Sequence, residues 1–169
     1  LGSTSRSVSS TIVSSGCAAD RTGPTSLVGV WRSSVQFQSG AFAPIHDLEF
    51  MYAFHGDGTL TESSNYDAAP PVPPAYGVWR AIGAREFEAR YDFFSTAASA
   101  PDAFAKGAGW NPSGRGILTE RIQLSSDGNA FTSTLRYEPL DAQGKPAQGG
   151  GTATGRGTRM HFEARAGTP

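Results

Sequence analysis

Apolar and polar residues alternate along most of this chain, in short runs that are separated by turn residues. In residues 48–55 every second position holds Leu, Phe or Tyr, and in residues 86–93 every second position holds Glu, Arg or Asp. Because successive side chains of a β-strand point to opposite faces, this period of two predicts strands with one buried face. The turn Gly56-Asp57-Gly58 between two such runs predicts a tight hairpin.

Runs of this kind continue to residue 162 and predict eight strands in simple succession. The predicted strands are residues 28–38, 48–55, 59–64, 76–82, 86–94, 116–124, 130–137 and 152–162. A long loop of small residues is expected over residues 95–113. Sequential antiparallel strands of this number close into an up-and-down barrel, which leaves no exposed sheet edge. We therefore predict an all-β, eight-stranded antiparallel barrel, with residues 1–26 as an irregular Ser/Thr-rich tail and residues 27–169 as one domain.

Composition narrows the classes of partner. The 169 residues suit one domain, and a net charge of −1 leaves no basic field to attract nucleic acid. No apolar run approaches the roughly 18 residues of a membrane-spanning helix. The single cysteine, Cys17, excludes an internal disulfide, and the three histidines lack metal-ligand spacing. We expect no metal site and no cofactor. The oligomeric state stays open.

A tetrapeptide occurs twice, as Gly29-Val30-Trp31-Arg32 and as Gly77-Val78-Trp79-Arg80. Gly29-x-Trp31 in the first strand, eight strands, and an arginine in the last strand, Arg156 or Arg159, resemble the lipocalin-like β-barrel domains of the calycin type. Bacterial lipocalin-like proteins of unassigned function share this likeness. It covers residues 27–162, and the lipocalin disulfide cysteines are absent.

This resemblance implies how one end of the barrel is closed. Gly29 would let another backbone come close, the indole of Trp31 would plug the floor, and the arginine, Arg156 or Arg159, would lie across that indole. It also implies a concave apolar site, although a fold does not fix a ligand. A second internal similarity links Glu49-x-x-Tyr52-x-Phe54 with Glu88-x-x-Tyr91-x-Phe93. It fits either an internal duplication or the frequent use of the same residue types in β-strands.

The phase of each strand predicts which side chains face the lumen. Aromatic residues and one arginine are expected to line it and to bind the ligand: Tyr52, Phe54, Trp79, Tyr91, Phe93, Phe131, Tyr137 and Arg156. Two acids also fall on apolar faces, since Glu62 follows Leu60 and Glu120 follows Leu118 at a spacing of two.

Glu62 and Glu120 have two interpretations. A carboxyl in apolar surroundings has a raised pKa and can serve as a general acid or base, so both are catalytic candidates if the protein is an enzyme. Alternatively they are solvated at the mouth of the barrel, or form structural ion pairs with Arg156 or Arg121. The residue types specify no reaction.

Three functions follow from these features. The first is binding of a small, mostly apolar molecule in the lumen. The second is an isomerase or cyclase that acts on an apolar, polyene or polyketide-like substrate in the same lumen. The third is an exported interaction module with a filled lumen and an apolar outer patch. Because the chain begins at Leu1 rather than methionine, secretion or a periplasmic location is an expectation, and the compartment stays open.

Overall fold

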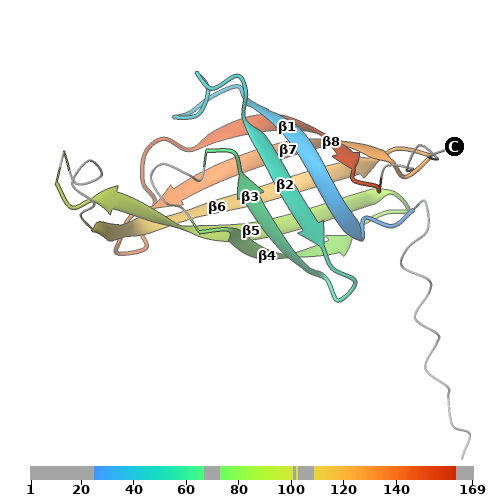
Figure 1. The fold of residues 1–169 in the computed structure, drawn as a ribbon, viewed down its shortest axis with the longest axis horizontal. Helices are drawn as coiled ribbons and strands as arrows, with labels where there is room; N and C mark the ends of the chain where they lie inside the picture. Colours follow the sequence, from blue (N-terminus) through green and yellow to red (C-terminus); the bar gives the residue numbers. More distant parts are fainter. Residues whose placement is uncertain (1–24, 67–72, 101, 103–108, 163–169) are drawn as a thin grey trace, which may run out of the picture.

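The structure is a computed structural model, which describes residues 25–66, 73–100, 102 and 109–162. These residues form eight strands and no helix (Figure 1). The strands are β1 (Gly29–Phe37), β2 (Glu49–Phe54), β3 (Thr59–Ser64), β4 (Ala75–Ala81), β5 (Glu86–Ala98), β6 (Trp110–Leu124), β7 (Ala130–Leu140) and β8 (Gly151–Arg159).

Each strand pairs antiparallel with the next one along the chain, and β8 pairs antiparallel with β1 to close the barrel. Buried and exposed positions alternate along β1, β7 and β8. The predicted eight-stranded antiparallel barrel is therefore confirmed. Residues 1–24 of the predicted tail lie outside the described residues.

The hairpin of β5 and β6 is longer than the sequence indicates. β5 continues to Ala98 and β6 begins at Trp110, and the two strands pair through a register shift between Ser95 and Thr96. The prediction of one loop over residues 95–113 is therefore wrong at both ends. Ladder hydrogen bonds are made by the backbone, so small side chains do not prevent strand pairing, although they hide the alternation that predicts it.

The two ends of the barrel differ. Tight turns join β2 to β3, β4 to β5 and β6 to β7 at one end, where β1 also begins and β8 ends; we call it the closed end (right in Figure 1). At the other end β1, β3, β5 and β7 finish; we call it the open end. The half of the barrel next to each end takes the same name.

A tryptophan and an arginine seal the closed end. Trp31 is 0% exposed, and the Cζ of Arg159 lies 4.2 Å from the centroid of the indole. The indole N–H donates to the carbonyl of Leu27 at 2.9 Å. Gly29 has a φ of 139°, and a Cβ there would lie 2.7 Å from Arg159 Nη1. A side chain at Gly29 would therefore displace the guanidinium.

Arg159 also ties three chain segments together. Its guanidinium donates to the carbonyls of Ser26 and Val28 at 2.6 Å each, and to the carbonyl of Gly128 at 2.8 Å. Ser26 and Val28 lie in the segment that leads into β1, and Gly128 lies in the turn between β6 and β7. Arg159 itself ends β8. Between the two arginines that the sequence left open, Arg159 is the one that covers Trp31.

Candidate functional site

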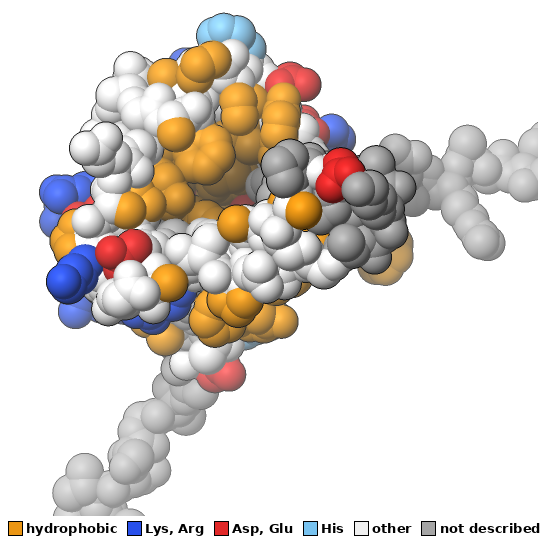
Figure 2. All heavy atoms as spheres, turned by 90° about the vertical axis from the view of Figure 1, so that its left-hand side faces the viewer, with side chains coloured by type: hydrophobic (Ala, Val, Ile, Leu, Met, Phe, Trp, Pro, Cys, Tyr) orange, Lys and Arg blue, Asp and Glu red, His pale blue; other side chains and the backbone are white. Residues whose placement is uncertain are grey.

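A cavity of about 300 Å³ lies in the open half of the barrel. Figure 2 looks onto the open end and shows a hollow whose walls are mostly hydrophobic side chains. Six aromatic residues contribute to the lining: Phe37, Phe42, Phe50, Tyr66, Phe93 and Tyr137. Among the described residues that line this cavity, Glu62 is the one carboxyl group, and none is Lys, Arg or His.

One wall of the cavity is a packed aromatic cluster. Phe93 and Tyr137 stack with ring centroids 6.1 Å apart and an interplanar angle of 11°. Phe42 packs its ring edge-on to Tyr137 at 5.2 Å and contacts Phe37 at 5.3 Å. Such offset and edge-to-face pairs hold the rings in fixed orientations. The rings of this wall therefore hold one another in place.

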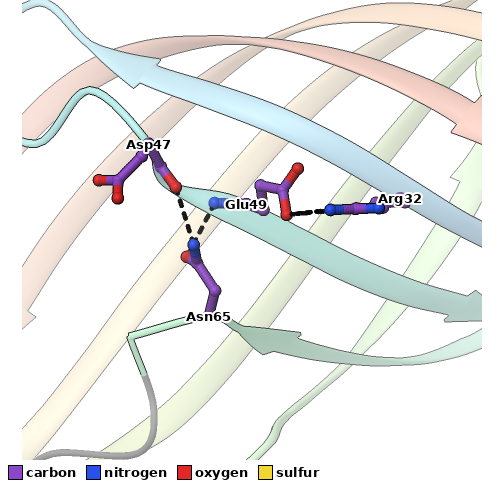
Figure 3. A network of polar contacts seen from close by, with 4 residues as sticks. All are labelled: Arg32, Asp47, Glu49 and Asn65. Carbon is purple, nitrogen blue, oxygen red and sulfur yellow. Dashed lines mark hydrogen bonds and ion pairs between the residues drawn. The ribbon is translucent and has the colours of Figure 1, made fainter.

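A polar network fixes the rim between β2 and β3 (Figure 3). The Asn65 side chain donates to the carbonyl of Asp47 at 2.7 Å and accepts from the backbone N–H of Glu49 at 2.9 Å. Glu49 in turn pairs with Arg32 on β1 at 2.6 Å. The Tyr66 hydroxyl donates to the carboxylate of Asp47. Because Tyr66 lines the cavity, this network holds one side of its mouth.

Glu62 belongs to both the cavity and the core. It lies on β3, is 5% exposed, and lines the cavity. Its cross-strand partner on β2 is Tyr52, which does not line the cavity and is 1% exposed. Glu62 therefore lies where the cavity meets the packed interior.

Two tyrosines and a carboxyl form a buried triad in that interior. The hydroxyls of Tyr52 and Tyr91 donate to Oε2 of Glu120 at 3.1 and 3.0 Å, and their oxygens lie 3.3 Å apart. The three residues come from β2, β5 and β6, and none is more than 1% exposed. We call these three residues the Tyr52–Tyr91–Glu120 triad. It crosses the barrel and needs closure of the sheet to form.

The environment of the triad shifts all three titrations. Burial raises the pKa of Glu120 to about 7, although the hydroxyls of Ser133, Tyr91 and Tyr52 act in the opposite direction. Burial also raises the pKa of both tyrosines well above the usual value, as do the charges of Glu120 and Glu62. Ser133 Oγ and Glu120 Oε1 make no hydrogen bond of good geometry within the described part of the chain. The two tyrosine hydroxyls therefore make the well-formed hydrogen bonds to this carboxyl.

The structure divides the predicted lumen residues among three places. Phe93, Tyr137 and Glu62 line the cavity. Tyr52, Tyr91 and Glu120 form the triad. Three other predicted ligand-binding aromatics lie in the closed half, away from the cavity: Phe54, Trp79 and Phe131.

Those three rings belong to the packed core of the closed half. Phe131 packs on Trp31 at 5.1 Å, and Trp79 packs between Phe54 and Phe87 at 6.0 and 5.7 Å. Large rings from several strands pack against one another there. The sequence predicted that these side chains point inward but not that they fill one half of the barrel.

The prediction that Arg156 points into the lumen is wrong. Along β8 the buried positions are Ala153, Gly155 and Gly157, and Arg156 is exposed on the outer face between them. A Cβ on Gly157 would lie 2.2 Å from the ring of Phe131, so this position has no room for a side chain. The inward face of β8 is made of its smallest residues, and its polar residues face solvent.

Sequence reasoning missed, among other lining residues, the two aromatic residues of the cavity that lie outside the strands. Phe42 lies in the connection between β1 and β2, among small residues without alternation, and Tyr66 follows the end of β3. Neither belongs to a strand, so the period of two could not place them. The one signal available was a large aromatic residue in an otherwise small or polar segment.

The chain matches no protein-family model and no curated protein at a significant level. The closed eight-stranded barrel is consistent with a lipocalin-like fold, and so is an arginine lying over the tryptophan of β1. Within the described residues no three His, Cys, Asp or Glu side chains are grouped to hold a metal ion. In the same residues no helix has the length and apolar character to cross a membrane.

Proposed function

We propose that this protein binds a small, mostly apolar molecule in the cavity of the open half. The observation that carries the proposal is a space of about 300 Å³ walled by packed aromatic rings. Ligand pockets in proteins span roughly 300–1,000 Å³ and combine apolar walls with a few polar groups. This cavity stands at the lower limit of that range, which favours a compact ligand.

The contrast between the two halves supports a binding role. The closed half is filled by its own side chains, as a barrel of this strand number permits. In the open half the inward positions include Ser64, Ala75 and Ser95, whose small side chains leave space that the opposite aromatic rings do not fill. The rim network then holds the mouth in shape around that space.

A cavity-filling variant tests this proposal. The environment-sensitive dye N-phenylnaphthylamine serves as an apolar probe, and its fluorescence reports binding. Ser95→Phe adds a ring at a lining position, and we expect the dissociation constant of the dye to rise by about tenfold or more. Ser34→Phe adds the same ring on the exposed outer face of β1 and should leave dye binding unchanged. Equal affinity in both variants would place the dye outside the cavity and contradict the proposal.

A second candidate function is proton-transfer catalysis, as in an isomerase or cyclase. The observation that favours it is a buried carboxyl in the cavity wall, because a carboxyl that a bound molecule can reach can act as a general acid or base. Glu120 does not line the cavity, whereas Glu62 does. Catalysis would therefore run through Glu62. Incubation with a conjugated polyene fatty acid, followed by product analysis for wild type and Glu62→Gln, tests it: turnover lost with affinity kept would favour catalysis.

The third function, an interaction module, has less support. Its expected filled lumen disagrees with the cavity of the open half. Exposed apolar residues do occur on the outer face of β1, β2 and β4, namely Val30, Met51, Tyr76 and Val78. Nothing in the structure indicates what would cover them.

A further inference from the structure

Two aromatic rings of the cavity wall lie side by side with nearly parallel planes. Phe93 comes from β5 and Tyr137 from β7, and both line the cavity. Their ring planes differ by 11°, and their centroids are 6.1 Å apart. Because stacked carbon atoms touch at about 3.5–4 Å, this centroid distance means that the rings are displaced sideways. We call these two residues the ring platform.

A glycine of the strand between them makes room for the ring platform. A Cβ on Gly116 of β6 would lie 2.2 Å from Cζ of Phe93 and 2.8 Å from Cε2 of Tyr137. The two rings therefore meet in the space over the backbone of β6 that a side chain at this position would take. Since their planes are nearly parallel, the two rings present their faces in the same direction and form one broad aromatic surface.

Two further rings of the lining meet the ring platform at steep angles. The planes of Phe42 and Phe37 are inclined to that of Tyr137 by 62° and 88°, with centroids 5.2 and 6.4 Å away. The face of an aromatic ring carries negative partial charge and its edge positive partial charge, so rings pair either offset and parallel or edge to face. An aromatic molecule in this cavity would find both kinds of partner.

The hydrophobic effect alone does not distinguish an aromatic ligand from a saturated one. A saturated ring system with the same carbon skeleton buries at least as much apolar area, so area burial alone favours it slightly. The saturated molecule lacks the charge distribution that pairs with ring faces and edges, and it is too thick to lie flat between rings. A preference for the aromatic molecule would therefore come from the rings of the wall.

We propose that this cavity selects a compact, planar aromatic ligand, which stacks on the ring platform of Phe93 and Tyr137. This inference rests on the proposed binding function and names the chemical class of its ligand. The volume of about 300 Å³ is at the lower limit for ligand pockets, which favours a body of one or two rings over a long chain.

A pair of probes with one carbon skeleton tests the inference. Naphthylethanol and decahydronaphthylethanol carry the same hydroxyl on the same carbon atoms, but only the first is planar and aromatic. Isothermal titration calorimetry gives the two dissociation constants. We expect the aromatic probe to bind about threefold to tenfold tighter than the saturated one. Equal affinity, or tighter binding of the saturated probe, would overturn the inference.

Variants assign the preference to the ring platform. Phe93→Leu and Tyr137→Leu each keep an apolar side chain and remove one ring of the platform, so the ratio of the two dissociation constants should fall towards one. Phe87→Leu is the matched control, because it removes a buried ring that packs on Trp79 in the closed half and does not line the cavity. It should keep the wild-type ratio. A wild-type ratio in both platform variants, or a ratio of one in Phe87→Leu, would overturn the assignment.

The outcomes separate this inference from the function on which it rests. If both probes displace N-phenylnaphthylamine equally well, the cavity binds apolar molecules without selecting aromatic ones, and only the inference fails. If the dye binds and neither probe does, the cavity does not take a compact aromatic body, and again the inference fails alone. If neither the dye nor either probe binds, both proposals fail.

Discussion

The closed and open halves of this barrel are built from the same strands and the same alternation, yet one is solid and the other hollow. In the closed half Trp31 packs against Phe131, and Trp79 packs against Phe54 and Phe87, within one hydrophobic core. In the open half Ser64 and Ala75 occupy inward positions of β3 and β4, and space is left beside the aromatic wall. Alternation therefore sets which residues point inward, whereas the summed volumes of those residues decide whether a cavity exists.

The repeated tetrapeptide makes the same point at the level of single residues. Trp31 is fully buried and lies under Arg159, whereas Trp79 is half-buried and its indole donates to the carbonyl of His55 at 3.0 Å. Trp31 pairs across β2 with Tyr52, and Trp79 pairs across β5 with Ala89. Identical local sequence therefore gives different roles, because neighbouring strands set the environment.

The largest expected effect comes from removing the floor of the closed half. Trp31→Ala should lower the free energy of unfolding by about 3–5 kcal/mol, since it deletes a buried aromatic side chain and leaves a cavity. Phe42→Ala in the open half should cost only about 1 kcal/mol, because Phe42 is half-buried beside existing space. Urea unfolding measures both. Similar losses would mean that the two halves contribute equally to stability.

Titration of Glu120, which lies between the two halves, should make the stability of the protein depend on pH. Glu120 has a pKa near 7 when folded and 4.5 as its ordinary value. As pH rises from 4.5 the unfolded chain loses this proton before the folded one does, so the free energy of unfolding falls until pH passes 7. The loss amounts to about 3 kcal/mol. Urea unfolding across this range should show the fall in wild type and in Glu88→Gln.

The variant that isolates this titration is Glu120→Gln. The amide cannot ionise, so the fall in stability between pH 4.5 and 7 should become shallower by the contribution of this group. An unchanged slope in Glu120→Gln would show that another group carries the pH dependence.

A smaller effect separates the two arginines of β8. Arg159→Leu removes three hydrogen bonds to carbonyls at the closed end and should cost about 2 kcal/mol. Arg156→Leu changes an exposed side chain of the outer face and should alter stability by less than about 0.5 kcal/mol. Thermal unfolding followed by circular dichroism compares them. A larger loss for Arg156→Leu would reverse the assignment of the floor.

The smallest effect is expected at the rim of the open half. Asn65→Ala removes two hydrogen bonds that join the end of β3 to the start of β2, at a cost of about 1 kcal/mol. The free energy of dye binding should change by more than the free energy of unfolding. The reason is that Asn65 holds Asp47, which in turn binds the hydroxyl of Tyr66 at the cavity mouth. Asn129→Ala, in the turn between β6 and β7, is the control, and it should leave dye binding unchanged.

The strands and the inward phase of both acids followed from alternation, because Leu60 and Leu118 fix the buried face of their strands. The position of the cavity did not follow, since it depends on how side chains from several strands fill one volume. β8 misled the prediction because its inward residues are Gly and Ala, which give no apolar phase, so Arg156 could not be told from an inward residue. The meeting of Tyr52 and Tyr91 at Glu120 needed a closed sheet, which no local pattern reports.

The link that Arg159 makes with Ser26 spans 133 residues, and the β1–β8 ladder beside it joins the first and last strands. Contacts of such sequence separation make folding slow, because much of the chain must be ordered before they form. Until β8 arrives, β1 presents an unpaired edge with a row of free backbone donors and acceptors. During folding this edge can pair with a strand from another copy, so formation of the hairpin of β7 and β8 decides between closure of the barrel and strand exchange between chains.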